Sequence, residues 1–183
     1  MKTSKIFWFT GLSGAGKTSV AEGSKQVIEH NGLSVLVLDG DDVRARFHRK
    51  LGFSEEDIKE NNRLIARICQ ENMEQYHVIL VPIISPFAES RQEACTLLGE
   101  NFFEVYCKSL IKTVEGRDIK GLYAKSRAGE LDNLIGYSPG GAIYEPPAAP
   151  DIILDSDNND LKVCIERFTQ FVLNQVQVEN VSI

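Results

Sequence analysis

Residues 6–18 read Ile-Phe-Trp-Phe-Thr-Gly-Leu-Ser-Gly-Ala-Gly-Lys-Thr, a short apolar run followed by a loop rich in glycine. The apolar run is typical of a buried strand. The residues from Lys17 to His30 have the pattern of a helix, which Asn31-Gly32 would end. Between the two, residues 11–18 match the full pattern Gly-x-x-x-x-Gly-Lys-Ser/Thr of a phosphate-binding loop. A loop in this position predicts a nucleotide site at the end of the first strand.

This loop has the chemistry to hold the phosphates of ATP. Glycines allow the main chain to turn so that successive N–H groups point toward an anion, and the helix that follows directs its positive end at the same place. Lys17 would reach the β- and γ-phosphates, and the hydroxyl of Thr18 would be a ligand of Mg²⁺. We therefore expect ATP and Mg²⁺ to bind through Gly11, Ser13, Gly14, Ala15, Gly16, Lys17, Thr18 and Ser19.

The rest of the chain alternates between strand and helix patterns. Runs that predict strands lie at 33–38, 77–81, 102–106 and 152–154, and helix patterns lie at 54–76, 89–98 and 161–176. Such alternation favours parallel strands joined by right-handed crossovers, and strands that are apolar throughout fit a sheet covered on both faces. The sequence predicts an α/β chain with a three-layer P-loop NTPase fold, in which a five-stranded parallel sheet has helices on both faces. Its length fits one domain over residues 1–183.

One segment, residues 116–150, does not follow this alternation. It is rich in Gly, Pro, Lys and Arg and is too long for an ordinary connection, so we expect a mobile lid. Arg117, Lys120, Lys125 and Arg127 make it basic. A run of charges is usually a solvated surface. A basic lid that closes over bound phosphates would instead exclude water and stabilise charge on a transferred phosphoryl group.

Polar residues follow the second and third predicted strands. Ligands of open parallel sheets bind beyond the carboxyl ends of the strands, which places these residues beside the phosphate loop. In residues 39–44, Asp-Gly-Asp-Asp-Val-Arg, a carboxylate could orient waters around Mg²⁺ or accept a proton from an acceptor hydroxyl. Arg44 could hold an anionic substrate; the alternative is an Asp-rich helix cap with Arg44 on the surface. Ser85 could bind substrate or cap the next helix, and Arg91 in that helix could face solvent.

Composition excludes several other kinds of partner. The chain has 20 Lys and Arg against 26 Asp and Glu, a formal charge of −6, which argues against non-specific binding to nucleic acid or to a membrane surface. Its four cysteines form no Cys-x-x-Cys pair, which argues against zinc and fits reduced thiols. The apolar run that ends at Thr10 is too short to span a membrane. We expect a cytoplasmic enzyme.

Taken together, these motifs resemble the adenylylsulfate kinases, a family that uses ATP to phosphorylate the ribose 3′-hydroxyl of adenosine 5′-phosphosulfate. The resemblance extends from about Lys5 to Asp155 and implies a doubly wound sheet, a mobile lid and a homodimer. It depends on Gly-Leu-Ser-Gly-Ala-Gly-Lys-Thr at 11–18, Asp-Gly-Asp-x-x-Arg at 39–44, Leu-Gly-Phe-Ser at 51–54, Glu60-Asn61, Ile84-Ser85-Pro86 with Arg91, Phe-Glu-Val-Tyr at 103–106, Arg-Asp-x-Lys-Gly-Leu-Tyr at 117–123, Arg-Ala-Gly-Glu at 127–130 and Tyr144-Glu145-x-Pro147.

The resemblance also implies roles for single residues. Asp41 matches the carboxylate expected near the acceptor hydroxyl and Mg²⁺, and Phe53 matches one side of a base-stacking sandwich. The expected catalytic residues are Asp41, Lys17 and Asp39, the expected metal ligands are Thr18 and Asp39, and Arg117 and Lys120 match contacts to ATP. The expected acceptor-binding residues are Arg44, Phe53, Asn61, Ile84, Ser85, Lys125 and Leu134.

The departures from the family pattern lie on the acceptor side. Where the family usually has an arginine that helps to hold the phosphosulfate, this chain has Ile58, and loss of such a charge-assisted bond is worth about 1.5–3 kcal/mol. Where the lid usually reads Asn-Phe-Thr-Gly, this chain has Leu134 and Ile135, which cannot supply base stacking worth about 1–3 kcal/mol. The link at 137–143 is longer than usual.

Three functions therefore remain open from sequence. The first is phosphorylation of adenosine 5′-phosphosulfate, and the second is the same transfer onto a different nucleotide such as cytidine diphosphoramidate. The third is a nucleotide-binding module without catalysis, against which the intact Lys17, Thr18, Asp39 and Asp41 argue.

Overall fold

A computed structural model describes residues 3–46 and 51–177, and within helix α2 it leaves the side chains at 41, 42 and 46 undescribed. Five parallel strands form one sheet, as the sequence predicted, and their order is β2-β3-β1-β4-β5. They are β1 (Lys5–Thr10), β2 (Val35–Val37), β3 (Val78–Val81), β4 (Phe102–Lys108) and β5 (Ile152–Asp155).

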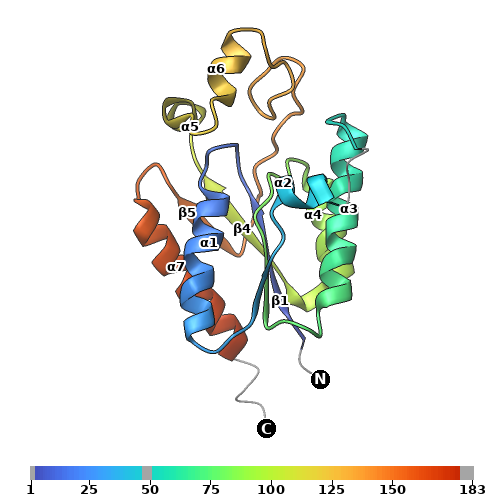
Figure 1. The fold of residues 1–183 in the computed structure, drawn as a ribbon, viewed down its shortest axis with the longest axis vertical. Helices are drawn as coiled ribbons and strands as arrows, with labels where there is room; N and C mark the ends of the chain where they lie inside the picture. Colours follow the sequence, from blue (N-terminus) through green and yellow to red (C-terminus); the bar gives the residue numbers. More distant parts are fainter. Residues whose placement is uncertain (1–2, 47–50, 178–183) are drawn as a thin grey trace.

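Helices cover both faces of this sheet, which confirms the three-layer α/β prediction (Figure 1). Helices α1 (Lys17–His30) and α7 (Leu161–Gln177) pack together on one face, and α3 (Glu55–Asn72) and α4 (Ala88–Leu98) pack together on the other. Alternate residues of a strand point to opposite faces, so β1 contributes to two cores. Phe7 and Phe9 pack with the α1–α7 side, and Ile6 and Trp8 pack with the α3–α4 side. None of the described helices could cross a membrane.

Three short helices were not predicted from the sequence: α2 (Gly40–Arg46), α5 (Ile111–Arg117) and α6 (Leu122–Arg127). They are too short to show an apolar period. The start of α6 depends instead on Asp118, whose carboxylate accepts hydrogen bonds from the main-chain N–H groups of Tyr123 and Ala124 at 3.0 and 2.8 Å. The segment 116–150 is therefore partly helical, and it lies beyond the carboxyl ends of the strands (Figure 1). Its mobility stays a prediction.

Smaller differences concern the ends of elements. Helix α3 begins after Ser54, whose hydroxyl accepts a hydrogen bond from the Asp57 N–H, but it ends at Asn72 rather than near Tyr76. Strand β2 covers only Val35–Val37, half of the predicted run.

The expectation that Arg91 could face solvent is wrong. Only 3% of this residue is exposed. Its guanidinium donates to Glu104 Oε1 at 2.6 Å, to the Ser85 carbonyl at 2.8 Å and to the Glu145 carbonyl at 2.8 Å. One buried cation thus joins α4, β4, the end of β3 and the end of the lid segment.

Replacing Arg91 with Met should lower the free energy of unfolding by about 3–5 kcal/mol, because Glu104 and two carbonyls would lose a buried charged partner. Urea denaturation followed by circular dichroism would measure this. Arg67→Met is the matched control, since Arg67 is exposed on α3 and its loss should change stability by less than about 0.5 kcal/mol. Equal midpoints for the two variants would contradict the structural role.

Candidate active site

The phosphate loop connects β1 to α1 through three glycines with positive φ. Gly11, Gly14 and Gly16 have φ of 149°, 78° and 94°. A Cβ at Gly11 would lie 2.5 Å from the carbonyl oxygen of Cys107 in β4, so no other residue fits there without moving the strand. The loop is therefore held against the sheet at its first residue and turned into α1 at its last.

Lys17 lies buried in this loop. Its Nζ donates to the carbonyl oxygens of Gly11 at 2.8 Å and Leu12 at 2.7 Å. These bonds hold the ammonium group at the wall of a cavity that Lys17 lines. A positive charge fixed at this point is what binding of the β- and γ-phosphates requires.

Thr18 and Asp39 meet at the same edge of the sheet. The hydroxyl of Thr18, in the first turn of α1, donates to Asp39 Oδ2 at 2.9 Å. Within residues 3–46 and 51–177, no cluster of three or more His, Cys, Asp or Glu could form a metal centre alone. One hydroxyl and one carboxylate nevertheless fit Mg²⁺, which binds few protein oxygens and takes its other ligands from phosphates and water.

One cavity of about 240 Å³ brings most of the predicted residues together. Its lining includes Ser13, Gly14, Gly16, Lys17, Thr18, Ser19, Asp39, Arg44, Phe53, Asn61, Ile84, Ser85 and Lys120. Further lining residues were not predicted to bind a ligand: Gly40, Ile58, Asn62, Pro82, Ile83, Pro86, Ile119 and Ile135. Motifs predicted most of the polar lining, whereas Asn62, Pro82 and Ile83 were singled out by no motif.

Several predicted residues do not line this cavity. Gly11 and Ala15 belong to the phosphate loop but do not line the cavity. The side chain of Asp41 lies outside the described part of the structure. Arg117 donates to the hydroxyl of Ser156 at 3.1 Å, and Lys125 is exposed on α6. Leu134 is buried in the α1–α7 core, and its neighbour Ile135 lines the cavity instead.

Phe53 and Arg44 form a pair at the outer end of the cavity. The guanidinium of Arg44 lies 4.8 Å from the centre of the Phe53 ring and donates to the carbonyls of Leu51 and Gly52 at 3.2 and 2.7 Å. Phe53 is 56% exposed. Because Arg44 covers one face of the ring, a nucleotide base could stack only on the other face.

Ser85 does not cap the next helix, because the N-cap of α4 is Phe87. Its hydroxyl instead accepts a hydrogen bond from the indole N–H of Trp8 at 3.0 Å. Its φ of 42° is unusual for a residue other than glycine, and such backbone strain tends to occur at functional sites. The buried tryptophan of β1 thus fixes the serine that lines the cavity.

The lid touches the phosphate loop through Tyr123, to which the sequence assigned no role. This residue of α6 is 2% exposed, and its hydroxyl donates to the Ser13 carbonyl at 2.8 Å. Burial raises the pKa of Tyr123 to about 12, so the hydroxyl keeps its proton and stays a donor. The ring of Tyr137 packs edge-on against Tyr123, and its hydroxyl donates to Glu115 at 2.7 Å.

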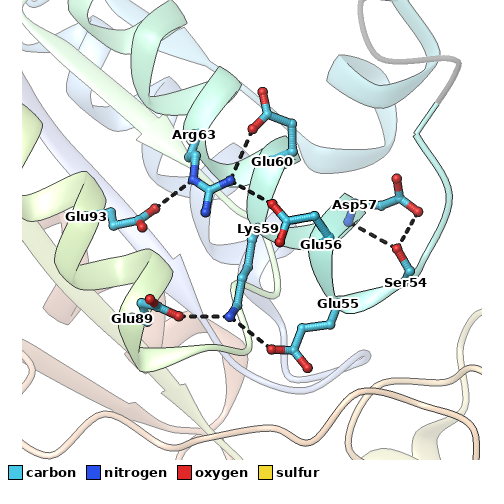
Figure 2. A network of polar contacts seen from close by, with 9 residues as sticks. All are labelled: Ser54, Glu55, Glu56, Asp57, Lys59, Glu60, Arg63, Glu89 and Glu93. Atoms are coloured by element: carbon cyan, nitrogen blue, oxygen red, sulfur yellow. Dashed lines mark hydrogen bonds and ion pairs between the residues drawn. The ribbon is translucent and has the colours of Figure 1, made fainter.

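Ion pairs join α3 to α4 (Figure 2). Lys59 lies between Glu55 and Glu89 at 2.9 and 2.8 Å, and the two carboxylates, Glu89 first, raise its pKa. Arg63 contacts Glu93 on α4 at 3.0 Å. These contacts fix the position of α3, the helix that carries Ile58, Asn61 and Asn62, relative to α4.

The family described as adenylylsulphate kinase matches residues 3–155. The chain belongs to the adenylylsulphate kinase family. A probable adenylyl-sulfate kinase of Bacillus subtilis (strain 168) is 42% identical over 172 residues, which cover 92% of this chain and 85% of that relative. An adenylyl-sulfate kinase of Halothermothrix orenii is 42% identical over 168 residues, or 90% of this chain and 87% of that relative.

Solved structures agree with this family. An APS kinase of Mycobacterium tuberculosis in complex with AMPPNP and APS has a TM-score of 0.83 at 37% identity, covering 97% of this chain and 99% of that one. The sequence-based resemblance to the adenylylsulphate kinase family is confirmed.

Replacing Tyr123 with Phe should weaken ATP binding about 3–10-fold, because the Ser13 carbonyl would lose a buried donor and the loop would lose a support. Isothermal calorimetry with ATP and Mg²⁺ would measure the change. The matched control is Tyr76→Phe, because Tyr76 precedes β3 at the far end of the sheet from the loop. An unchanged dissociation constant in the Tyr123 variant would refute the coupling.

Proposed function

We propose that this chain is an ATP-dependent kinase that phosphorylates the ribose 3′-hydroxyl of adenosine 5′-phosphosulfate. The observation that carries the proposal is one cavity whose lining includes both Lys17 and Thr18 of the phosphate loop and the predicted acceptor residues Phe53, Asn61 and Ser85. Phosphate donor and nucleotide acceptor would therefore share one space. The relative of known structure binds AMPPNP and APS, an ATP analogue and this acceptor.

Transfer in this cavity needs positioning and charge stabilisation more than covalent chemistry. The loop N–H groups and Lys17 would hold the donor phosphates. The acceptor 3′-oxygen forms a bond to the γ-phosphorus while the bond from that phosphorus to the bridging oxygen of ADP breaks. Asp41, in the first turn of α2, would take the hydroxyl proton.

Thr18 and Asp39 would hold Mg²⁺ beside the phosphates. When bound, this ion supplies positive charge to the phosphate oxygens. From the lid, Lys120 lines the same cavity and would add charge, while Ile119 and Ile135 would exclude water. We further propose that the protein works as a homodimer in the cytoplasm, where the four free thiols would stay reduced.

Steady-state kinetics with ATP, Mg²⁺ and a panel of acceptors tests the proposal. Adenosine 5′-phosphosulfate should give a higher kcat/KM than cytidine or uridine nucleotides, and Lys17→Ala should abolish turnover because the phosphates lose their buried cation. Turnover would be followed by ADP release and by the appearance of the 3′-phosphorylated product. A cytidine nucleotide used orders of magnitude better would overturn the assigned acceptor while leaving the kinase assignment in place.

Ile58 is the observation that favours a second acceptor. It is buried at the cavity wall, where the family usually carries an arginine. An apolar side chain there offers the phosphosulfate no charge-assisted bond, and an acceptor with a different terminal group could suit it better. Cytidine diphosphoramidate therefore belongs in the panel as the second candidate.

Asp41→Asn should lower kcat by about 10²–10⁴-fold while the affinity for ATP stays within about threefold, because only the proton acceptor is lost. Single-turnover kinetics and ATP titration would separate the two effects. Asp42→Asn, which removes the adjacent carboxylate, is the control and should retain activity. Unchanged turnover in the Asp41 variant would remove its assigned role.

A further inference from the structure

Asn62 carries a buried amide that the chemistry above does not use. It lies in α3, is 3% exposed, and lines the same cavity as Lys17 and Ser85. Among the residues that the structure describes, its Nδ2 has no hydrogen-bond partner. A buried amide donor without a partner lowers the stability of the folded state by about 1–3 kcal/mol. The presence of such a group in Asn62 therefore needs a physical explanation.

Two asparagines at the ends of helices, one after α1 and one in the last position of α3, satisfy their amides locally. Asn31 and Asn72 each donate Nδ2 to the carbonyl four residues earlier, at 2.8 and 2.7 Å. Within the described part of α3, Asn62 makes no such bond to Ile58, the residue four positions before it. Residues four apart share one face of a helix, and Asn62 and Ile58 both line the cavity. The Asn62 side chain therefore lies at the cavity wall without a bond to its own helix, and its Nδ2 is enclosed. Because the terminal torsion of an asparagine has broad preferences, rotation of the amide would turn the donor to the cavity.

The surroundings of Asn62 suit a polar group of a ligand. The lining that comes from α3 and from the segment after β3 is uncharged, and besides Asn62 it comprises Ile58, Asn61, Pro82, Ile83, Ile84, Ser85 and Pro86. The described cations of the cavity, Lys17, Arg44 and Lys120, come from the loop, α2 and the lid. The α3 wall therefore offers hydrogen bonds in an apolar setting, where each bond discriminates strongly between ligands that can and cannot make it.

We propose that Asn62 is a specificity-determining residue, whose amide donates a hydrogen bond to an oxygen of the acceptor nucleotide. This inference rests on the proposed function, because it assigns the α3 wall of the cavity to the acceptor. Bound acceptor would satisfy the amide. An acceptor that lacks an oxygen at this point would leave the amide buried and unpaired.

Asn62→Leu tests the inference, because leucine keeps the shape of the side chain and removes the donor. The dissociation constant of adenosine 5′-phosphosulfate, measured by calorimetry with a non-hydrolysable ATP analogue present, should rise about 10-fold. KM for the acceptor should rise equally, with kcat and the KM for ATP nearly unchanged. The melting temperature should stay level or increase, since an unpaired polar group leaves the interior.

Thr169→Val is the matched control. Thr169 in α7 also has a buried polar atom without a partner in the described chain, but it lies away from the cavity. Its replacement should leave acceptor binding unchanged. A second variant, Asn62→Asp, keeps the shape and replaces the donor by a carboxylate, so it should weaken binding of the anionic acceptor more than leucine does.

Two results would overturn the inference: acceptor affinity within twofold of wild type in both folded Asn62 variants, or an equal loss in Thr169→Val. Failure of the proposed function would look different. If the unaltered protein binds a cytidine nucleotide but not adenosine 5′-phosphosulfate, the same variants are measured with that nucleotide, and a 10-fold loss there supports the role of Asn62. If no nucleotide acceptor binds, both proposals fail.

Discussion

The end of β1 is the point on which the rest of the structure depends. Gly11 packs so closely on the Cys107 carbonyl of β4 that a Cβ would lie 2.5 Å from it, and its N–H donates to the Ile84 carbonyl at 3.3 Å. The preceding Thr10 donates to the same carbonyl at 2.9 Å and contacts the Tyr144 hydroxyl at 3.0 Å. The end of β3, the end of β4 and the end of the lid segment therefore converge on two residues. These contacts at Thr10 and Gly11 fix the position of the phosphate loop.

Sequence patterns predicted the sheet and the phosphate loop because both depend on local chemistry. Glycine spacing, a lysine and a run of apolar residues specify the β1–loop–α1 unit with little help from the rest of the chain. Arg91 shows where this reasoning fails. Its burial depends on Glu104 and on carbonyls of Ser85 and Glu145, which lie up to 54 residues away, and no local pattern reports such partners.

At the candidate site, local sequence patterns likewise failed to predict the helix in the lid and part of the cavity lining. Helix α6 begins at a carboxylate cap rather than at an apolar period, so the segment looked irregular from sequence. Leu134 and Ile135 are adjacent in the chain, and only the fold decides that the first enters the core and the second lines the cavity. Asn62 carried no signal at all, because an asparagine in an amphipathic helix is usually on its solvent face.

The two walls of the cavity differ in the kind of discrimination they can provide. In the proposed function, charges on the loop and lid side would act on phosphates that every nucleoside triphosphate shares, so they would contribute to rate and donor affinity but little to the choice of acceptor. The α3 wall carries Ile58 and the amides of Asn61 and Asn62, on a helix that the Lys59 and Arg63 ion pairs join to α4 (Figure 2). In the proposed function this wall would contact the acceptor. A polar site that is dry rejects a ligand lacking the matching atom more strongly than an apolar site rejects a missing methylene. Acceptor choice in this chain should therefore be set by the α3 wall, and the replacement of a cation by Ile58 places more of that choice on hydrogen bonds.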